Sequence, residues 1–152
     1  LVLPEVRLHE QTMLVPGTDG EKMSKSRDNI INLFLDDKKL RKQIMTIATD
    51  STPLEDPKDW KTCNCFALYN IMASPSEIEI MKANYENGGY GYGHAKQALF
   101  ELIVSKFSEP RERYNYYMNN LVEVDKALAI GAEKATKVAN EVIQRVRKKL
   151  GY

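Results

Sequence analysis

The chain has 152 residues, 43% of them hydrophobic and 28% charged, a balance typical of folded globular proteins that excludes the polar, charge-unbalanced composition of disordered chains. Lysine and arginine total 22 and aspartate and glutamate total 21, so the net charge of +1 gives no general electrostatic argument for nucleic acid, membranes or acidic ligands. No apolar run approaches the roughly 20 residues of a membrane span and no signal-peptide core is found, which predicts a cytoplasmic protein without a membrane partner.

The N-terminal segment is predicted to belong to the end of a domain. The chain starts with Leu1 instead of methionine, which indicates a piece of a longer protein. A short apolar run, Thr12–Val15, stops at Pro16-Gly17 and is typical of a buried strand that leads into a loop. Residues 16–29 combine glycine, serine and charge without an apolar period, so we expect an exposed, mobile loop there, and chemistry with it.

Helices are predicted for the rest of the chain, beginning after Asp36. This aspartate can cap a helix whose inward positions are Leu40, Ile44 and Ile47, because these apolar residues recur at helical spacing. Residues 50–58 contain serine, threonine and two prolines, which indicates a linker between helical elements.

A capping box marks the start of a further helix. Ser74 can cap it, Pro75 suits its first turn, and Glu77 completes the box. The glycine pair that follows Asn87 should end this helix, since glycine tolerates the left-handed conformation of many helix ends. The positions expected to be buried are Ile78, Met81 and Tyr85.

Three more apolar stripes follow at helical spacing, and all are expected to pack inward. They are Ala95, Leu99, Leu102, Ile103 and Phe107; then Tyr114, Tyr117, Met118 and Leu121; and last Ala132, Ala135, Ala139, Val142 and Val146. The sequence therefore predicts a mainly α fold, a C-terminal helical bundle preceded by one strand and the polar loop.

The polar loop carries the residues best suited to chemistry. Between Gly17 and Ser26 it holds two serines and two lysines, Lys22 and Lys25. Ammonium groups and hydroxyls donate hydrogen bonds to phosphate oxygens, and glycines let backbone N–H groups approach a ligand. The order of residues is not that of a P-loop, because no Gly-Lys-Ser or Gly-Lys-Thr follows a glycine at the required spacing. A polyphosphate-binding loop is therefore predicted, and a P-loop hydrolase is disfavoured.

The five residues Lys22-Met23-Ser24-Lys25-Ser26 match in full the KMSKS motif of class I aminoacyl-tRNA synthetases. Two later segments, Tyr85–Gly91 and Gly131–Ala135, resemble the helical domain of the tryptophanyl-tRNA synthetase family. The resemblance implies that residues 1–35 end a Rossmann-type catalytic domain, with its last strand and the KMSKS loop, and that residues 36–152 form the C-terminal helical, anticodon-binding domain.

What the resemblance implies for function is a tryptophan–tRNA ligase. Such an enzyme activates L-tryptophan with ATP to the aminoacyl-adenylate and transfers the aminoacyl group to tRNA(Trp), and the full-length protein is expected to be a homodimer. The cofactor-binding residues implied are Lys22, Met23, Ser24, Lys25 and Ser26, with Lys22 and Lys25 catalytic. Mg²⁺ is expected to come with ATP, since no Asp, Glu or His cluster has the spacing to hold it.

Two alternatives stay open from the sequence. One is a tyrosyl-tRNA synthetase fragment, and the other is a helical tRNA- or protein-binding module without catalysis. The second ATP motif of class I synthetases, of the His-Ile-Gly-His type, and an amino-acid pocket are not found here and are expected upstream of Leu1. We therefore expect this fragment to be inactive alone.

Three further features have open or ordinary interpretations. Asp19 can orient the loop, approach the nucleotide or cap its own turn. Cys63 and Cys65 lack the spacing of zinc ligands, and no metal site is predicted, so packing thiols are favoured. The cations of the last helix can meet tRNA phosphates or simply suit a solvated helix end. They are Lys134, Lys137, Arg145, Arg147, Lys148 and Lys149.

Overall fold

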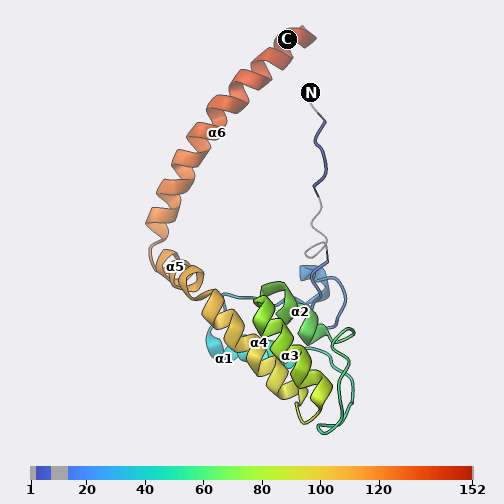
Figure 1. The fold of residues 1–152 in the computed structure, drawn as a ribbon. Helices are drawn as coiled ribbons and strands as arrows, with labels where there is room; N and C mark the ends of the chain where they lie inside the picture. Colours follow the sequence, from blue (N-terminus) through green and yellow to red (C-terminus); the bar gives the residue numbers. More distant parts are fainter. Residues whose placement is uncertain (1–2, 8–13, 152) are drawn as a thin grey trace. The chain divides into compact units, whose positions relative to one another are not determined.

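A computed structural model describes residues 3–7 and 14–151 of the chain (Figure 1). These residues form a 3-10 turn, η2 (Lys25–Arg27), and six α-helices: α1 (Asp37–Met45), α2 (Asn64–Met72), α3 (Pro75–Asn87), α4 (Tyr92–Lys106), α5 (Ser108–Asn119) and α6 (Leu121–Leu150). The contacts divide the chain into two compact units, Leu1–Ser108 and Glu109–Tyr152. The predicted mainly α fold is confirmed.

The predicted strand is tested only at its end, because Thr12 and Met13 lie outside the described residues. Leu14 is 57% exposed and Val15 is half-buried. Over residues 14–151 the only β-type pairing is an isolated antiparallel bridge between Pro16 and Lys22.

Within the described residues no helix is both long and apolar enough to cross a membrane.

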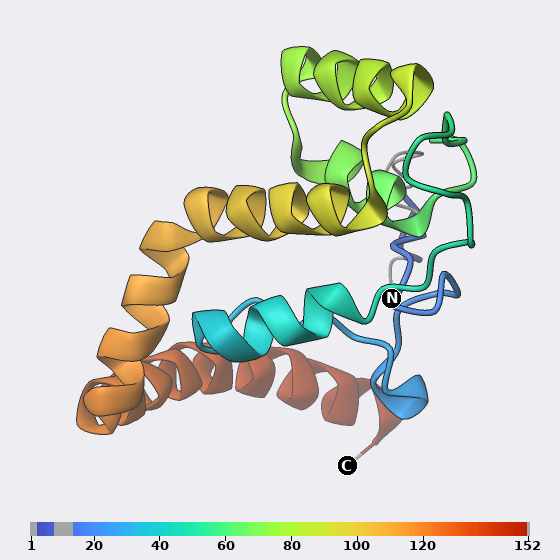
Figure 2. The same cartoon turned by 90° about the horizontal axis from the view of Figure 1, so that it is seen from below.

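The core of the first unit forms where α1 and α2 both pack on α4. Figure 2 shows α1 running alongside α4. Helix α1 begins as predicted, because the Asp36 carboxylate accepts a hydrogen bond from the backbone N–H of Lys39. Leu40 and Ile44 are both fully buried. Helix α4 buries the predicted face, Ala95, Leu99, Leu102 and Ile103, against them.

Helix α3 confirms the predicted capping box. The Ser74 side chain accepts from the backbone N–H of Glu77, and the Glu77 carboxylate accepts from the backbone N–H of Ser74 at 2.7 Å. Two donors at the helix start are thereby satisfied. The helix ends at Asn87, and both following glycines have positive φ. Met81 and Tyr85 are buried as predicted, and Ile78 is half-buried.

Tyr85 is the centre of an aromatic cluster in this unit. Its ring lies 5.8 Å from Phe66, 6.0 Å from Tyr90 and 6.2 Å from Tyr92, measured between ring centroids. Its hydroxyl is 3.4 Å from the Cys63 sulfur. Both cysteines are buried free thiols, and burial raises the pKa of Cys65 to about 12, so this thiol stays protonated at neutral pH.

The predicted linker is an irregular segment that folds around Lys58. This lysine is only 4% exposed, yet its ammonium donates to the carbonyls of Pro53, Leu54 and Asp56 at 2.9, 3.2 and 3.0 Å. A buried ammonium without such acceptors would be costly. The three bonds therefore hold the linker in one conformation.

The Glu55 carbonyl of this segment lies so close to Gly88 that only glycine fits there. A Cβ there would overlap the Glu55 carbonyl oxygen, whereas a Cβ on Gly89 meets nothing within 4 Å, although φ is 71° and 73° at the two positions. We expect Gly89→Ala to lower the free energy of unfolding by about 1 kcal/mol, the cost of positive φ alone. Gly88→Ala should lose roughly 1–3 kcal/mol more, because overpacking is added and because φ 71° with ψ 176° is a region that essentially only glycine occupies. Urea unfolding followed by Trp60 fluorescence measures both, and equal losses would contradict the close approach.

The second unit contains most of α5 and all of α6, and here the predicted burial is wrong. No residue of either helix is buried. The exposed fraction is 40% for Tyr114, 53% for Met118 and 39% for Val142. The 12 residues of α5 extend about 18 Å, but the 30 residues of α6 extend about 45 Å. The two helices do not pack along one another, so the apolar stripes of both stay at the surface of this unit.

Candidate phosphate-binding loop

The polar loop is closed at its base by backbone hydrogen bonds. The N–H of Met23 donates to the carbonyl of Val15 at 2.9 Å, and the N–H of Gly17 donates to that of Glu21 at 2.7 Å. Gly20, with φ 85°, makes the turn between them and donates to the Gly17 carbonyl at 3.1 Å. The loop is therefore an ordered turn with a paired base.

Among the KMSKS residues, Met23 and Ser24 are half-buried, whereas Lys22, Lys25 and Ser26 are exposed. Met23 is half-buried and packs against the core, where it lines an open apolar hollow of about 160 Å³. The other residues around this hollow are Val15, Ile31, Leu33, Leu68, Ile71, Met72 and Ile103. Lys22 and Lys25, which flank Met23 and Ser24 within the motif, are exposed. The methionine thus anchors the motif while both ammonium groups reach the surface.

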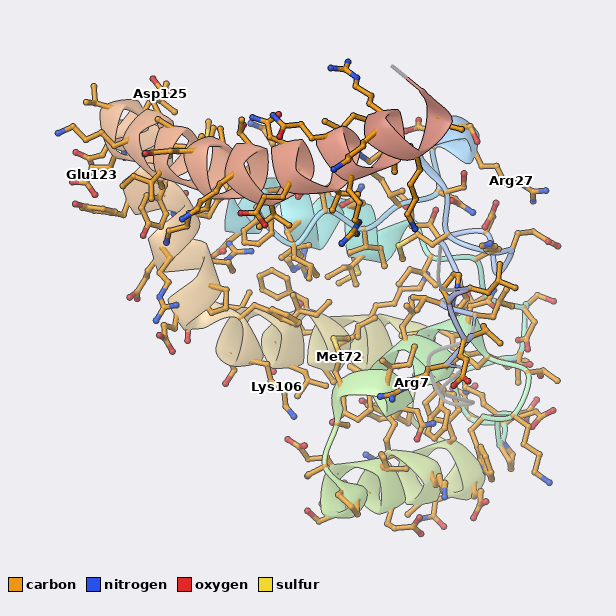
Figure 3. The ribbon with its side chains drawn as sticks, turned by 90° about the horizontal axis from the view of Figure 1, so that it is seen from above. Arg7, Arg27, Met72, Lys106, Glu123 and Asp125 are labelled. Atoms are coloured by element: carbon orange, nitrogen blue, oxygen red, sulfur yellow. The ribbon has the colours of Figure 1, made fainter. Side chains whose placement is uncertain are left out.

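The last two residues of the motif, Lys25 and Ser26, form a single 3-10 turn together with Arg27. The N–H of Arg27 donates to the carbonyl of Ser24 at 3.2 Å, and the hydroxyls of Ser24 and Ser26 are 2.9 Å apart. Figure 3 shows the Arg27 side chain extending outward from this part of the unit. It lies 3.6 Å from the Glu21 carboxylate, an exposed pair of the kind that contributes little to stability.

Asn29 lies at the centre of the loop, and the sequence pattern did not point to it. It is only 2% exposed. Its side-chain oxygen accepts from the N–H of Ser24 at 2.7 Å, and its amide nitrogen donates to the Asp19 carboxylate at 2.7 Å. A lone asparagine within a polar stretch gives no periodic signal, so its burial is visible only in three dimensions.

Asp19 is fixed by the same network. Its carboxylate also accepts from the backbone N–H of Glu21 at 3.0 Å. The hydrogen bond from Asn29, followed by that from Glu21, holds the pKa of the Asp19 carboxyl below its usual range. Of the three roles open from the sequence, these contacts match the turn-capping and loop-orienting ones.

The loop is attached to the helices at two points. The carbonyl of Thr18 accepts from the N–H of Ala48, just after α1, at 2.6 Å. Gly20 lies against Asn64 at the start of α2, where an added Cβ would come within 2.6 Å of the Asn64 amide. The Asn64 amide in turn donates to the Ala48 carbonyl at 3.2 Å. These contacts fix the turn relative to the first unit's core.

The site therefore offers positive charge and neutral donors on a fixed base. Among the described residues, no ion pair joins Lys22 or Lys25 to a carboxylate, so both ammonium groups can meet an anion. The Ser24 and Ser26 hydroxyls are hydrogen-bonded to each other, which leaves one hydroxyl hydrogen free to donate beside the two lysines. No group of three or more His, Cys, Asp or Glu side chains in the described part of the chain could hold a metal ion. A polyphosphate is the ligand class that this arrangement fits.

Comparison with known proteins is consistent with this site. Residues 1–108 match the family described as tRNA synthetases class I (W and Y). The chain is 45% identical over 149 residues to a tryptophan–tRNA ligase of Campylobacter jejuni (strain RM1221), covering 98% of this chain and 47% of that protein. It is also 45% identical over 150 residues to the tryptophan–tRNA ligase of Rhodopirellula baltica, again covering 47% of the relative.

A solved structure resembles the whole chain. The crystal structure of tryptophanyl-tRNA synthetase from Campylobacter jejuni, complexed with ADP and tryptophan, superposes with a TM-score of 0.88 at 45% identity. The match covers 99% of this chain and 47% of that one. This chain thus spans about half the length of the relatives that it matches.

Proposed function

The chain belongs to the family tRNA synthetases class I (W and Y), and we propose on this premise that its full-length protein is an ATP-dependent tryptophan–tRNA ligase. The enzyme would activate L-tryptophan to the adenylate and transfer it to tRNA(Trp). The observation that carries the proposal is the KMSKS loop, with both lysines exposed and its methionine anchored, in a chain 45% identical to tryptophan–tRNA ligases over nearly all its length. That breadth favours tryptophan over tyrosine, and favours an enzyme over a binding module.

In the proposed first step the tryptophan carboxylate attacks the α-phosphate of ATP, and pyrophosphate leaves. Negative charge grows on the leaving group, so donors fixed around it stabilise the transition state. Lys22 and Lys25 would supply positive charge to stabilise it, with Ser24 and Ser26 as neutral donors. Met23 would act through its packing on the core, which holds the two lysines at the surface.

Magnesium fits the proposal as a companion of the nucleotide. No carboxylate cluster among the described residues is built to hold it, and Mg²⁺ commonly keeps several waters and binds substrate phosphates. We therefore propose that Mg²⁺ arrives with ATP. This chain's contribution would be the lysine and serine donors, without a protein ligand to the ion.

The proposed functional division places the end of the catalytic domain in residues 1–35 and the anticodon-binding helices in residues 36–152. This boundary lies inside the compact unit Leu1–Ser108, since Ile31 and Leu33 pack on the helical core. A loop proposed to bind ATP thus packs on helices proposed to bind tRNA. In α6 the cations named above are all exposed and available for tRNA phosphates.

The remaining partners follow from the same proposal. We propose a homodimer for the full-length protein and a cytoplasmic location, where tRNA and ATP are found. Because half of each relative's length lies outside this chain, the fragment alone should neither activate tryptophan nor charge tRNA.

The test is amino-acid-dependent ATP–pyrophosphate exchange by the full-length protein. We expect exchange with tryptophan and none above background with tyrosine. Exchange with tyrosine instead would move the specificity to the sister enzyme, and exchange with neither would favour a binding module. The purified 152-residue chain serves as the matched control, and measurable exchange by it would contradict its proposed inactivity.

A further inference from the structure

We infer that Asn29 is a positioning residue for adenylate formation, holding the backbone of the KMSKS motif so that Lys22 and Lys25 meet the triphosphate. The inference rests on the proposed function. Asn29 itself would touch no substrate, because it is buried beneath the loop at 2% exposure. It would act only through the residues that it binds.

The hydrogen bonds of Asn29 join both arms of the loop. Its side-chain oxygen accepts from the N–H of Ser24 at 2.7 Å, and its amide nitrogen donates to the Lys22 carbonyl at 3.2 Å. The same nitrogen donates to the Asp19 carboxylate at 2.7 Å, and its backbone carbonyl accepts from the N–H of Thr18 at 2.9 Å. The two bonds to Lys22 and Ser24 bracket Met23, so they set the direction in which the motif leaves the loop base.

The side chain of Asn29 is packed tightly against Gly17. A Cβ on Gly17 would overlap the Asn29 amide group, so glycine lets the turn close directly over this side chain. No buried side-chain polar atom in the described part of the chain lacks a partner. A buried amide that lost its partners would be costly, so the loop conformation and the asparagine depend on each other.

These hydrogen bonds all stay within residues 18–29, and none reaches the helices. Changing Asn29 should therefore disturb the loop more than the core. This distinguishes positioning from general stabilisation. A displacement of reacting groups by about 1 Å can cost roughly 100-fold in rate. The tryptophan pocket is expected upstream of Leu1, so tryptophan binding should be unaffected by the displaced loop.

The experiment swaps the amide of Asn29 and the carboxylate of Asp19 in the full-length protein. Asn29→Asp keeps the shape and the acceptor for Ser24, but it places a carboxylate against that of Asp19. We expect kcat for tryptophan-dependent pyrophosphate exchange to fall about 10- to 100-fold, with the KM for tryptophan unchanged. Adding Asp19→Asn restores one donor and one acceptor between the two positions but not the bond to the Lys22 carbonyl, so it should recover part of the loss. Asn140→Asp, on exposed α6, is the matched control and should leave exchange unchanged.

A second readout follows the loop itself. Trypsin cleaves after lysine and arginine, so faster cleavage after Lys22, Lys25 or Arg27 in Asn29→Asp, reversed by the added Asp19→Asn, would report a loosened loop without using activity. If Asn29→Asp fails to fold, Asp19→Ala removes the same bond from its exposed side and should lower kcat several-fold. Three results would each overturn the inference: no loss in kcat, no rescue by the added Asp19→Asn, or an equal change in the KM for tryptophan. Absence of pyrophosphate exchange by the unmodified protein would instead reject the proposed function.

Discussion

Replacing Lys25 by alanine is expected to slow tryptophan-dependent pyrophosphate exchange by the full-length protein about 100- to 1,000-fold, equivalent to about 2.7–4 kcal/mol of barrier. The reason is that charge on the leaving pyrophosphate develops only in the transition state, so a donor aimed at it affects rate more than ground-state binding. Lys25 is exposed at the start of a 3-10 turn whose base is fixed to the core. Pre-steady-state adenylate formation and equilibrium tryptophan binding, measured on the same protein, separate the two effects.

The matched control is Lys38→Ala, which removes an exposed lysine from α1, outside the loop. It should leave adenylate formation unchanged, and this tests whether general loss of positive charge explains the effect. Lys25→Arg keeps the charge but changes its shape, so it should recover part of the rate. An equal loss of tryptophan affinity and of rate in Lys25→Ala would contradict a transition-state role.

Leu99→Ala should cause the largest loss of stability among single core changes, about 2–5 kcal/mol in the free energy of unfolding. Leu99 is fully buried on α4, the helix on which both α1 and α2 pack. Truncation removes transfer free energy and leaves a cavity that several elements would have to close. Urea unfolding of the 152-residue chain, followed by fluorescence, measures the loss.

Trp60 makes this measurement specific to the first unit. It is the chain's single tryptophan, and its ring lies 5.2 Å from that of Phe66, which is part of the same core. Leu128→Ala on α6 is the control, because Leu128 is 65% exposed and belongs to the other unit. Its effect on the Trp60 transition should stay within about 0.5 kcal/mol. Similar losses for both leucines would mean that the two units unfold as one.

Much of the helical fold could be predicted from the sequence because its signals are local. Asp36 and the Ser74–Glu77 box start their helices through bonds to residues three positions away, and the glycines after Asn87 end one through their own φ. The KMSKS motif could also be recognised from the sequence, because it is defined by residue types in a fixed order. The sequence alone therefore identified the starts of α1 and α3, the end of α3, the face of α4 that is buried, and the residues proposed to meet ATP, but it gave no bounds for α2.

Tertiary structure alone decided how these local elements are used. The sequence predicted burial for the apolar stripes of α5 and α6, but a stripe is buried only if another element covers it, and none does so within their unit. It also gave Asn29 no distinction from its polar neighbours. Asn29 became central because the turn at Gly17 closes over it and brings Asp19, ten residues away along the chain, within 2.7 Å of its amide. Burial and hydrogen bonding between distant residues depend on where the folded chain brings them, and no local pattern encodes that position.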